Sequence, residues 1–265
     1  MKIGFIGCGN MGRAMMEGIL KAGSAQAENV FGSNRSAAVL DDLQKRLGIR
    51  ICLTNVDLVD SCEIIFLTVK PQVYPMVIEE VRDHVRPDQL IISPAPGFSL
   101  TKLEELFARP VKLIRAMPNT PALVGEAMTA ICPNDRVSDW EFGKVRDLLK
   151  SFGRVDRVEE GWMSAVTAIS GSSPAYVFVM LEAMADAAVL KGLPRHLAYP
   201  FAAQAVLGAA KMALDTGMHP GQLKDMVTSP AGTTIEAVRI LEENGFRSAL
   251  IEAVIACAEK SDLLG

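Results

Sequence analysis

The chain has 265 residues, enough for one large or two modest domains with a buried core. Apolar residues make up 49% of the sequence and charged residues 22%, as is typical of a soluble globular protein. The formal net charge of -4 provides no basic surface for nucleic acid or for an anionic membrane, so neither partner is expected.

Hydropathy and cysteine content bear on location. In the second half the longest unbroken apolar run, residues 175–181, ends at Glu182, well short of the roughly 20 residues that span a bilayer. The chain opens with a strand pattern and a glycine loop rather than a signal peptide. The five cysteines are scattered and form no C-x-x-C pair: Cys8, Cys52, Cys62, Cys132 and Cys257. We therefore expect reduced thiols, no metal site and a cytoplasmic location.

The first element in chain order is a predicted strand, Lys2–Ile6, which leads into a glycine-rich loop and a helix from Arg13 to about Lys21. The loop reads Gly7, Cys8, Gly9, Asn10, Met11, Gly12. G-x-G-x-x-G between a strand and a helix is typical of dinucleotide binding, because the glycines permit a tight turn, a close approach to a pyrophosphate and close helix-on-strand packing. We expect this loop to bind a dinucleotide; the alternative is a tight turn without a ligand.

The second strand, near Asn29–Gly32, indicates which dinucleotide binds. It ends in Ser33, Asn34, Arg35 and Ser36, without the carboxylate that usually meets a free ribose 2′-hydroxyl. A cation beside hydroxyl and amide groups suits a 2′-phosphate instead. We expect NADPH to be preferred and NADH also to be accepted. The alternative, a polar loop whose Ser36 caps the helix 37–47, is compatible with this function.

Strands continue to alternate with helices up to about residue 158, which predicts an α/β domain with a doubly wound parallel sheet over residues 1–158. The expected strands are Gly48–Ile51, Glu63–Val69, Leu90–Ser93, Val111–Arg115, Glu126–Cys132 and Gly153–Asp156, with helices at Val73–His84 and Ser138–Ser151.

Three loops follow the carboxyl ends of these strands, where ligands of parallel sheets bind. The first comprises Thr68, Val69, Lys70 and Pro71, and we expect it to face the cofactor. For Lys70 a solvated loop lysine is the alternative. The other two loops are 94–99 and 116–121, of which the latter holds Asn119 and Thr120 between two prolines and is either a ligand contact or a stiff turn.

Residues 159–265 are predicted to be all helical. The helices are expected at Gly161–Ile169, Ser173–Lys191, Arg195–Thr216, Pro220–Val227, Thr233–Glu243 and Phe246–Leu263. Between Ala175 and Leu190 the only charges are Glu182 and Asp186, and a helix that is apolar almost all round must be buried. We expect burial against a second subunit, with the core of a monomeric bundle as the alternative.

A loop of small and hydroxyl residues, 228–234, leads into one of these helices. Thr233 and Glu236 are spaced as a capping box, with Thr233 as the N-cap. The first amides of a helix have no intrahelical partners and suit a small carboxylate. An ordinary well-capped surface helix is the alternative.

The sequence contains no residue pattern typical of metal-dependent hydrolysis, nucleophilic catalysis or nucleotide hydrolysis. His84, His196 and His219 have no partners at ligand spacing, and no zinc-protease, nucleophile-elbow or P-loop pattern is present. A nicotinamide-dependent redox step remains, with a substrate pocket expected between the two domains. A protonated C=N bond accepts hydride without a strong acid or base, and the hydroxyl of Thr234 could hydrogen-bond its nitrogen.

Motifs along the whole chain resemble the pyrroline-5-carboxylate reductase family. They are Ile6–Gly12, Thr68–Pro71, Arg115–Pro121, Ser170–Tyr176 and Pro220–Val238, in the family's order. The resemblance implies a Rossmann-type N-terminal domain, a C-terminal dimerisation domain over residues 159–265, and NAD(P)H-dependent reduction of Δ1-pyrroline-5-carboxylate to L-proline. It also implies homodimers with interlaced C-terminal helices, often assembled into rings.

The resemblance also implies site residues. Cofactor contacts are expected from Gly7–Gly12, Ser33, Asn34, Arg35, Asn55, Val69, Lys70, Pro71, Ala95, Pro96 and Gly97. Substrate contacts are expected from Ser229, Gly232, Thr233, Thr234 and Glu160, with the carboxylate on the amides of 232–234 and Thr234 as the catalytic hydroxyl. Some members have Asn at Met226 and many have Gly at Ala231; the second change should still permit the loop. Cys8 we interpret as a packing residue.

Two other functions are weighed against this one. A β-hydroxyacid dehydrogenase shares the layout but needs a catalytic lysine, and Lys191, Lys211 and Lys224 do not follow a glycine-rich helix start. A non-catalytic NADP-binding protein would explain only the first domain.

Overall fold

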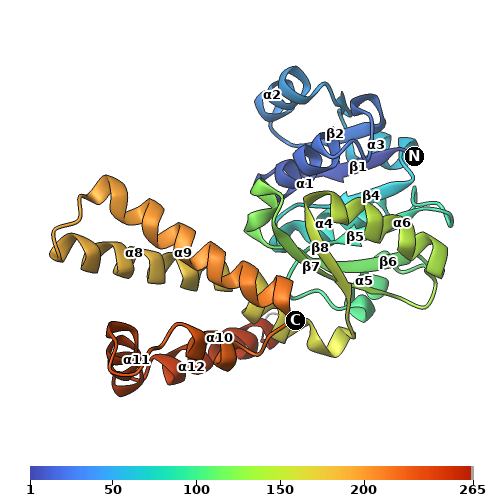
Figure 1. Ribbon diagram of the computed structural model, residues 1–265. Coiled ribbons are helices and arrows are strands. Elements are labelled where there is room, and N and C mark those ends of the chain that lie inside the picture. Colours follow the sequence, from blue (N-terminus) through green and yellow to red (C-terminus); the bar gives the residue numbers. More distant parts are fainter. Residues whose placement is uncertain (264–265) are drawn as a thin grey trace. The chain divides into compact units, whose positions relative to one another are not determined.

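The computed structural model describes residues 1–263, which divide into two compact units. Unit 1 comprises Met1–Ser172 together with the C-terminal residues from Cys257 on, and unit 2 comprises Ser173–Ala256. Figure 1 shows the sheet of unit 1 and the helices of unit 2. The boundary predicted after residue 158 marks where strands give way to helices, and as a statement about domains it stays a prediction.

Unit 1 is built on one eight-stranded sheet within the described residues. Its strands are β1 (Ile3–Ile6), β2 (Val30–Ser33), β3 (Arg50–Ile51), β4 (Ile64–Leu67), β5 (Leu90–Ser93), β6 (Lys112–Met117), β7 (Ala127–Pro133) and β8 (Gly153–Arg157). They lie in the order β3-β2-β1-β4-β5-β6-β7-β8. The four-residue strands β1, β2, β4 and β5 are buried along their whole length, as expected where helices cover both faces of a parallel sheet.

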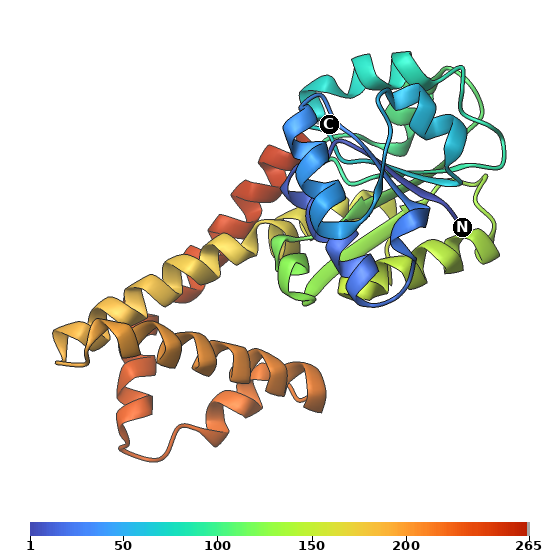
Figure 2. The same ribbon diagram turned by 90° about the horizontal axis from the view of Figure 1, so that it is seen from above.

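The helices of unit 1 cover the two faces of the sheet in two groups (Figure 2). They are α1 (Asn10–Lys21), α2 (Ala37–Leu47), α3 (Asn55–Ser61), α4 (Tyr74–Val81), α5 (Leu100–Phe107), α6 (Asp139–Leu149) and α7 (Met163–Val166), with short turns η1 (Ala27–Asn29), η2 (Pro71–Val73), η3 (Thr120–Val124), η4 (Lys150–Phe152), η5 (Glu160–Trp162) and the π-helical η6 (Thr167–Gly171). Apolar side chains of α1, α2 and α6 form the core on one face, and those of α3, α4 and α5 form the core on the other. The doubly wound α/β fold is therefore confirmed.

The last two strands, β7 and β8, depart from the predicted parallel sheet, and the change of direction occurs where β6 and β7 pair antiparallel. Only residues 118–126 join them, with the single short turn η3 and no crossover helix. A parallel connection needs about a dozen residues or more, so a link of this length returns the chain in the opposite direction. The crossover through α6 then places β8 parallel to β7.

Two helices of unit 1, α3 and α5, lie where no helix was predicted. Both begin at a hydroxyl cap: the Thr54 side chain accepts a hydrogen bond from the Asp57 amide at 3.0 Å, and Ser99 accepts one from the Lys102 amide at 3.1 Å. Threonine and serine before a short amphipathic segment are a readable helix-start signal, which could have revealed both helices.

The long helices of unit 2 match their prediction closely. They are α8 (Ser173–Leu190), α9 (Arg195–Thr216), α10 (Pro220–Met226), α11 (Thr233–Glu243) and α12 (Phe246–Asp262), whose last residues belong to unit 1. Figure 1 shows α8 and α9 side by side as a hairpin, turned at Gly192 with a φ of +91°. Gly and Pro at helix boundaries make these ends readable from sequence.

Unit 2 buries very little of its apolar surface. Ala185 is the buried residue of α8, Ala198 and Ala202 are those of α9, and α10, α11 and α12 have none within the described residues. Large side chains lie open instead, with Phe178 63% and Phe201 67% exposed. A helix pair that is apolar on all sides and lacks a core of its own needs another surface to cover it.

By length and composition, two helical stretches could cross a membrane: residues 160–190, whose most apolar 18 residues have a mean hydropathy of 1.4, and α9, whose most apolar 18 residues have 1.2. Glu182 and Asp186 interrupt the first stretch, so its longest unbroken apolar run is short. Core helices of soluble proteins pass the same test of length and composition. A membrane and a protein partner are thus two ways of covering this surface.

Candidate functional site

The sheet order creates a crevice between β1 and β4. From β1 the chain winds outward to β2 and β3, and then crosses back to β4 and β5 on the other side. Connections on the two sides of such a reversal leave opposite faces, so the loops beyond the carboxyl ends of β1 and β4 diverge and leave room for a ligand. The predicted glycine loop and the predicted loop 68–71 are those two loops.

The three glycines of the loop each have a separate physical reason. Gly7 has a φ of +94°, which favours glycine, and a Cβ there would lie 2.8 Å from the Val69 amide nitrogen. A Cβ on Gly12 would lie 2.7 Å from the Gly7 carbonyl oxygen, so this glycine lets α1 pack closely. A Cβ on Gly9 would meet nothing within 4 Å, so its surroundings are open to a ligand. Turn, approach and packing are the three roles of a dinucleotide loop.

Gly9 is also the N-cap residue of α1, which has no side-chain cap and no acidic residue in its first turn. The first amides of this helix, from Asn10, Met11 and Gly12, are left for a ligand that accepts hydrogen bonds. Together with the open space at Gly9, they suit the negative charge of a pyrophosphate.

A pocket of about 270 Å³ joins the loops that follow β1, β2 and β4. Many of the predicted cofactor residues line it: Gly7, Gly9, Ser33, Asn34, Arg35, Asn55, Val69 and Lys70, with Thr68 beside them. Arg35 and Lys70 take part in none of the ion pairs found among residues 1–263, so two unpaired cations flank the pocket. The structure thus brings together one half of the predicted set and gives it a positive charge.

Ser33, Asn55 and Glu80 form a hydrogen-bonded chain in this pocket. The Ser33 hydroxyl donates to Oδ1 of Asn55 at 2.6 Å, and Nδ2 of Asn55 donates to Oε2 of Glu80 at 2.7 Å. Glu80, on the last turn of α4, also lines the pocket. Glu80 was not among the predicted site residues, because the acid of a dinucleotide site is expected directly after β2. No periodic or motif signal links a residue of α4 to the loop after β2.

Cys8 lies within the loop, but its side chain points into the core. It is 2% exposed, its thiol donates to the Ser33 carbonyl at 3.5 Å, and burial raises its pKa to about 12. Its backbone is held as well, since the amide donates to Oδ1 of Asn34 at 3.3 Å and the carbonyl accepts from Nε of Arg13 at 3.1 Å. A neutral thiol among apolar side chains is a packing residue.

The remaining predicted cofactor residues do not line this pocket. Pro71 begins η2, and Ala95 is a buried residue of the loop that follows β5. Gly97, beside Pro96, lines a second hollow with Ser99, Arg115 and Glu160. That loop also follows the carboxyl end of a parallel strand, so it lies at the same edge of the sheet.

Glu160 already has strong partners. Its Oε1 accepts from Nη1 of Arg115 at 2.7 Å and from the Leu100 amide at 2.6 Å. The carboxylate thus ties the start of α5, and the loop 94–99 before it, to β6. In this structure Glu160 orders the loop that holds Gly97, and its predicted contact with substrate stays a prediction.

Asn119, predicted as either a ligand contact or part of a stiff turn, acts structurally. It is 8% exposed, its Oδ1 accepts from the Met128 amide at 3.0 Å, and its Nδ2 donates to the Ser170 carbonyl at 3.1 Å. One amide side chain therefore joins the end of β6 to β7 and to the π-helical turn η6. The stiff-turn interpretation fits these contacts.

The loop before α11 differs from its prediction at the cap. The N-cap residue of α11 is Gly232, no side chain caps the helix, and Thr233 is its first helical residue. Glu236 pairs with Arg239 at 2.8 Å, and the hydrogen bonds from Arg239 hold the pKa of Glu236 below its usual range. The predicted capping box of Thr233 and Glu236 is therefore wrong. A charged partner on the next turn competes successfully for the carboxylate.

The loop's backbone explains the shifted cap. Ala231 has a φ of +54°, and the Gly232 amide donates to the Ser229 carbonyl at 3.0 Å, which closes a tight turn. A Cβ on Gly232 would lie 2.3 Å from the Ser229 hydroxyl, so a larger residue there would displace the Ser229 side chain. Because the Gly232 amide donates to Ser229, only the amides of Thr233 and Thr234 remain of the three that were predicted to bind a carboxylate.

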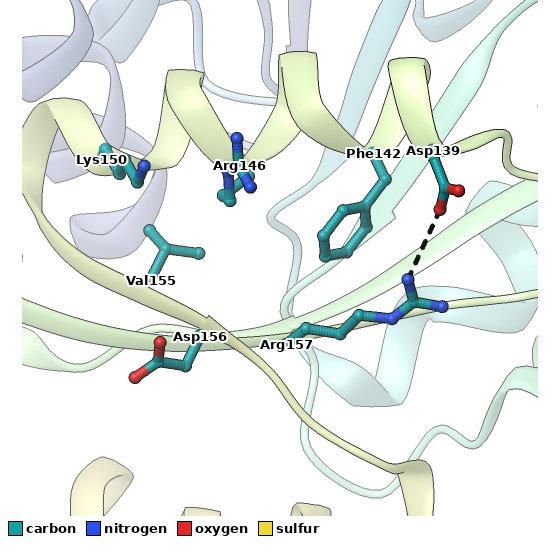
Figure 3. A pocket seen from close by; sticks show the side chains of 7 residues that line it. All are labelled: Asp139, Phe142, Arg146, Lys150, Val155, Asp156 and Arg157. Atoms are coloured by element: carbon teal, nitrogen blue, oxygen red, sulfur yellow. Dashed lines mark ion pairs between the residues drawn. The ribbon is translucent and has the colours of Figure 1, made fainter.

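A larger hollow lies elsewhere, between α6 and β8 (Figure 3). It measures about 680 Å³, and Figure 3 shows Arg157 pointing along Phe142 toward Asp139, with which it forms an ion pair at 3.6 Å. Because β8 runs antiparallel to β1 and β4, its carboxyl end lies at the opposite edge of the sheet. None of the predicted site residues lines this hollow, and its charges are partly paired.

Comparison with known proteins gives two family matches. A model described as pyrroline-5-carboxylate reductase dimerisation matches residues 160–264, and one described as NADP oxidoreductase, coenzyme F420-dependent, matches residues 2–97. The pyrroline-5-carboxylate reductase of Escherichia coli is 47% identical over 99% of this chain and 98% of its own. That of Methanosarcina acetivorans is 46% identical over 100% of this chain and 98% of its own.

Solved structures agree with these relatives. The Plasmodium falciparum pyrroline carboxylate reductase with NADP bound superposes with a TM-score of 0.92 at 34% identity, covering 100% of this chain and 98% of its own. The Coxiella burnetii pyrroline-5-carboxylate reductase gives 0.93 at 33% identity over the same shares. A prephenate dehydrogenase from A. aeolicus, with a TM-score of 0.56 at 12% identity over 95% of this chain and 98% of its own, shares the fold alone.

Proposed function

The chain belongs to the pyrroline-5-carboxylate reductase family, and we propose that it reduces Δ1-pyrroline-5-carboxylate to L-proline, the last step of proline biosynthesis. NADPH is the preferred cofactor in this proposal, and NADH is also accepted. The observation that carries the proposal is the pocket between β1 and β4, where a dinucleotide loop and two unpaired cations meet.

The residues present fit a nicotinamide dinucleotide. The open space at Gly9 and the free amides at the start of α1 suit its pyrophosphate, and Arg35 and Lys70 add positive charge. When bound, such a cofactor supplies the hydride that reduces a C=N bond. The chain's own residues orient the cofactor through the glycine loop and offset its negative charge.

The substrate's carboxylate is held in this proposal at the start of α11. The amides of Thr233 and Thr234 lie in the first turn, where the helix dipole favours an anion and no side chain caps the helix. Ser229 lies beside Gly232 and completes the loop. The Gly232 amide, predicted as a third donor, already donates to Ser229, so it contributes only if the turn opens.

Thr234 provides the hydroxyl for the ring nitrogen. A hydroxyl both accepts and donates, so it can accept from the N–H of the protonated imine and donate to the amine nitrogen that forms on reduction. No group with a shifted pKa is required at this step, in keeping with the absence of a histidine from residues 228–238.

We propose further that unit 2 associates with a second copy of the chain. The open apolar surface of α8 and α9 supports this, as does the match of residues 160–264 to a dimerisation model. Charged residues on the hairpin argue against lipid, because Asp186 forms an ion pair with Arg195 and a charged side chain is costly within a bilayer. A ring of dimers and a cytoplasmic location are expectations that accompany this proposal; the free thiols are compatible with the latter.

The β-hydroxyacid dehydrogenase alternative gains no support from the helical domain. Two of its three candidate lysines are occupied, since Nζ of Lys211 lies 2.6 Å from Asp215 and Nζ of Lys224 lies 2.7 Å from Asp225. A 3-hydroxyisobutyrate dehydrogenase shares the fold alone, at 17% identity.

The deciding experiment follows NADPH absorbance at 340 nm, the usual wavelength for this cofactor, after addition of Δ1-pyrroline-5-carboxylate. We expect oxidation of NADPH and formation of proline in equal amounts. Cofactor binding without turnover would show that the chain is a dinucleotide-binding protein and not this reductase.

A further inference from the structure

We propose that Glu80 limits the preference of this protein for NADPH over NADH. Its carboxylate lies in the pocket that holds Arg35, so one residue favours a 2′-phosphate and the other opposes it. The inference rests on the proposed function, in that the pocket binds the adenosine end of a nicotinamide dinucleotide. It names a specificity-determining residue that lies outside the strand-end position where such an acid is expected.

Three elements assemble this part of the pocket. Ser33 ends β2, Asn55 is the first residue of α3, and Glu80 lies on the last turn of α4. The loop after β2 is where a Rossmann-type domain meets the adenosine ribose, and its usual acid hydrogen-bonds the 2′-hydroxyl. Here that loop has Arg35 instead, and the only carboxylate among the residues that line the pocket comes from α4.

The hydrogen bonds fix the direction of the polar chain. Only the amide NH₂ of Asn55 can donate to the Glu80 carboxylate, so Oδ1 of Asn55 must face Ser33 and accept its hydroxyl proton. Ser33 therefore offers lone pairs to a ligand and not its proton. A ribose hydroxyl can donate to Ser33 or to Glu80, whereas a phosphate dianion has no proton for either group.

The charge of Glu80 also favours a ribose hydroxyl over a 2′-phosphate. Glu80 and Arg35 are both exposed and form no ion pair with each other among the described residues, so neither neutralises the other by direct contact. A carboxylate near a phosphate dianion repels it, and repulsion at a solvated site amounts to a several-fold effect on affinity rather than a complete block. The pocket should accept both cofactors, with a preference set by the balance of Arg35 and Glu80.

The test compares Glu80→Gln with Glu79→Gln by calorimetric titration of the full-length protein with NADP⁺ and with NAD⁺. Gln keeps an oxygen that accepts from Asn55, so the substitution removes charge and leaves the hydrogen-bonded chain in place. Glu79 is the adjacent exposed acid and does not line the pocket, which makes it a matched control for loss of one negative charge.

We expect E80Q to tighten NADP⁺ binding by about three- to tenfold at low salt and to leave NAD⁺ binding within about twofold, because only NADP⁺ has the phosphate that Glu80 repels. The gain should shrink as salt is raised. E79Q should change both affinities by less than about twofold, since an exposed charge outside the pocket is strongly screened. A ratio of the two affinities that is the same in E80Q and E79Q overturns the role of Glu80.

Adenosine monophosphates provide a second readout that does not depend on the nicotinamide half. The 2′-phosphate and the 5′-phosphate isomers have equal charge but place it differently, so E80Q should tighten binding of the 2′ isomer alone. Equal gains for both isomers overturn the proposal. Wild-type protein that binds neither dinucleotide overturns the proposed function itself, a result distinct from binding with an unchanged ratio.

Discussion

At the scale of single residues, the hydroxyl of Thr234 is the group that we expect to contact the reacting atoms. Thr234→Ala should lower kcat/KM by roughly ten- to a few hundredfold, the worth of about one hydrogen bond to a charged group at 1.5–3 kcal/mol. Thr234→Ser keeps the hydroxyl and should retain most of the activity. Steady-state kinetics with NADPH and Δ1-pyrroline-5-carboxylate measures both variants. Unchanged kinetics in Thr234→Ala would remove this hydroxyl from the mechanism.

Arg35 is the second residue with a sharp expectation. Because a guanidinium binds phosphate by charge-assisted hydrogen bonds, Arg35→Ala should weaken NADPH by about tenfold or more and NADH by much less. Lys45→Ala, which removes an unpaired cation from α2 away from the pocket, is the matched control. Dissociation constants for both cofactors measure the difference. Equal losses for NADPH and NADH would contradict the assignment of Arg35 to the 2′-phosphate.

Single residues also show where sequence patterns reach their limit. Gly7, Gly9 and Gly12 could be assigned their roles in advance, because a turn, an open approach and a close helix contact are properties of neighbouring backbone. Glu80 could not be assigned, because its place in the pocket depends on how α4 packs over the loop after β2. Its partner Asn55 lies 25 residues earlier in the chain.

At the scale of elements, the turn before α11 stores strain at Ala231. An alanine at a φ of +54° is less favourable than a glycine, which adopts the left-handed region without a Cβ clash. Ala231→Gly should raise the free energy of unfolding by about 0.5–1 kcal/mol, net of glycine's greater entropy when unfolded. Chemical denaturation measures this change.

A control for Ala231→Gly lies in the helix that follows this turn. Ala237 is an exposed helical residue of α11, and Ala237→Gly should destabilise the protein by roughly 0.5–1 kcal/mol. If two glycine substitutions six residues apart change the free energy of unfolding in opposite directions, the backbone conformation at position 231 decides the effect. Destabilisation by both would mean that Ala231 is not strained in solution.

The cap of α11 is instructive at the same scale. A threonine followed three residues later by a glutamate is a good helix-start pattern, and the helix does begin at Thr233. The pattern does not specify whether the threonine lies just before the first turn or within it. The tight turn between Ser229 and Gly232 moves the cap back by one residue, and Arg239 binds the glutamate. The first-turn amides then have no side-chain competitor for a ligand.

At the scale of the whole molecule, the open apolar surface of unit 2 predicts self-association. Light scattering after size exclusion, without detergent, should give a mass at least twice the 28.5 kDa of one chain. Phe178→Glu or Phe201→Glu should weaken association, because each places a charge on a surface that becomes buried. Trp140→Glu, a similarly exposed aromatic residue of unit 1, should not. A wild-type monomer, or protein that remains with membranes, would contradict the dimer.

Local sequence patterns were sufficient to predict the strands of unit 1, most of its helices, the glycine loop and the helix ends of unit 2. These features depend on residues close together in the chain: the glycine spacing at Gly7–Gly12, the hydrophobic period of each segment, and stop signals such as Gly192 and Pro194. The span Arg195–Thr216, for example, is predicted and observed with the same bounds.

Three features were visible only in the folded chain: the reversed direction of β7 and β8, the cap at Gly232, and the meeting of Ser33, Asn55 and Glu80 in one pocket. Each depends on the geometry of loops or on contacts between segments that are far apart in the chain. Local propensity therefore does not predict them. For the same reason, a helix that is apolar on all sides predicts burial but does not predict which surface covers it.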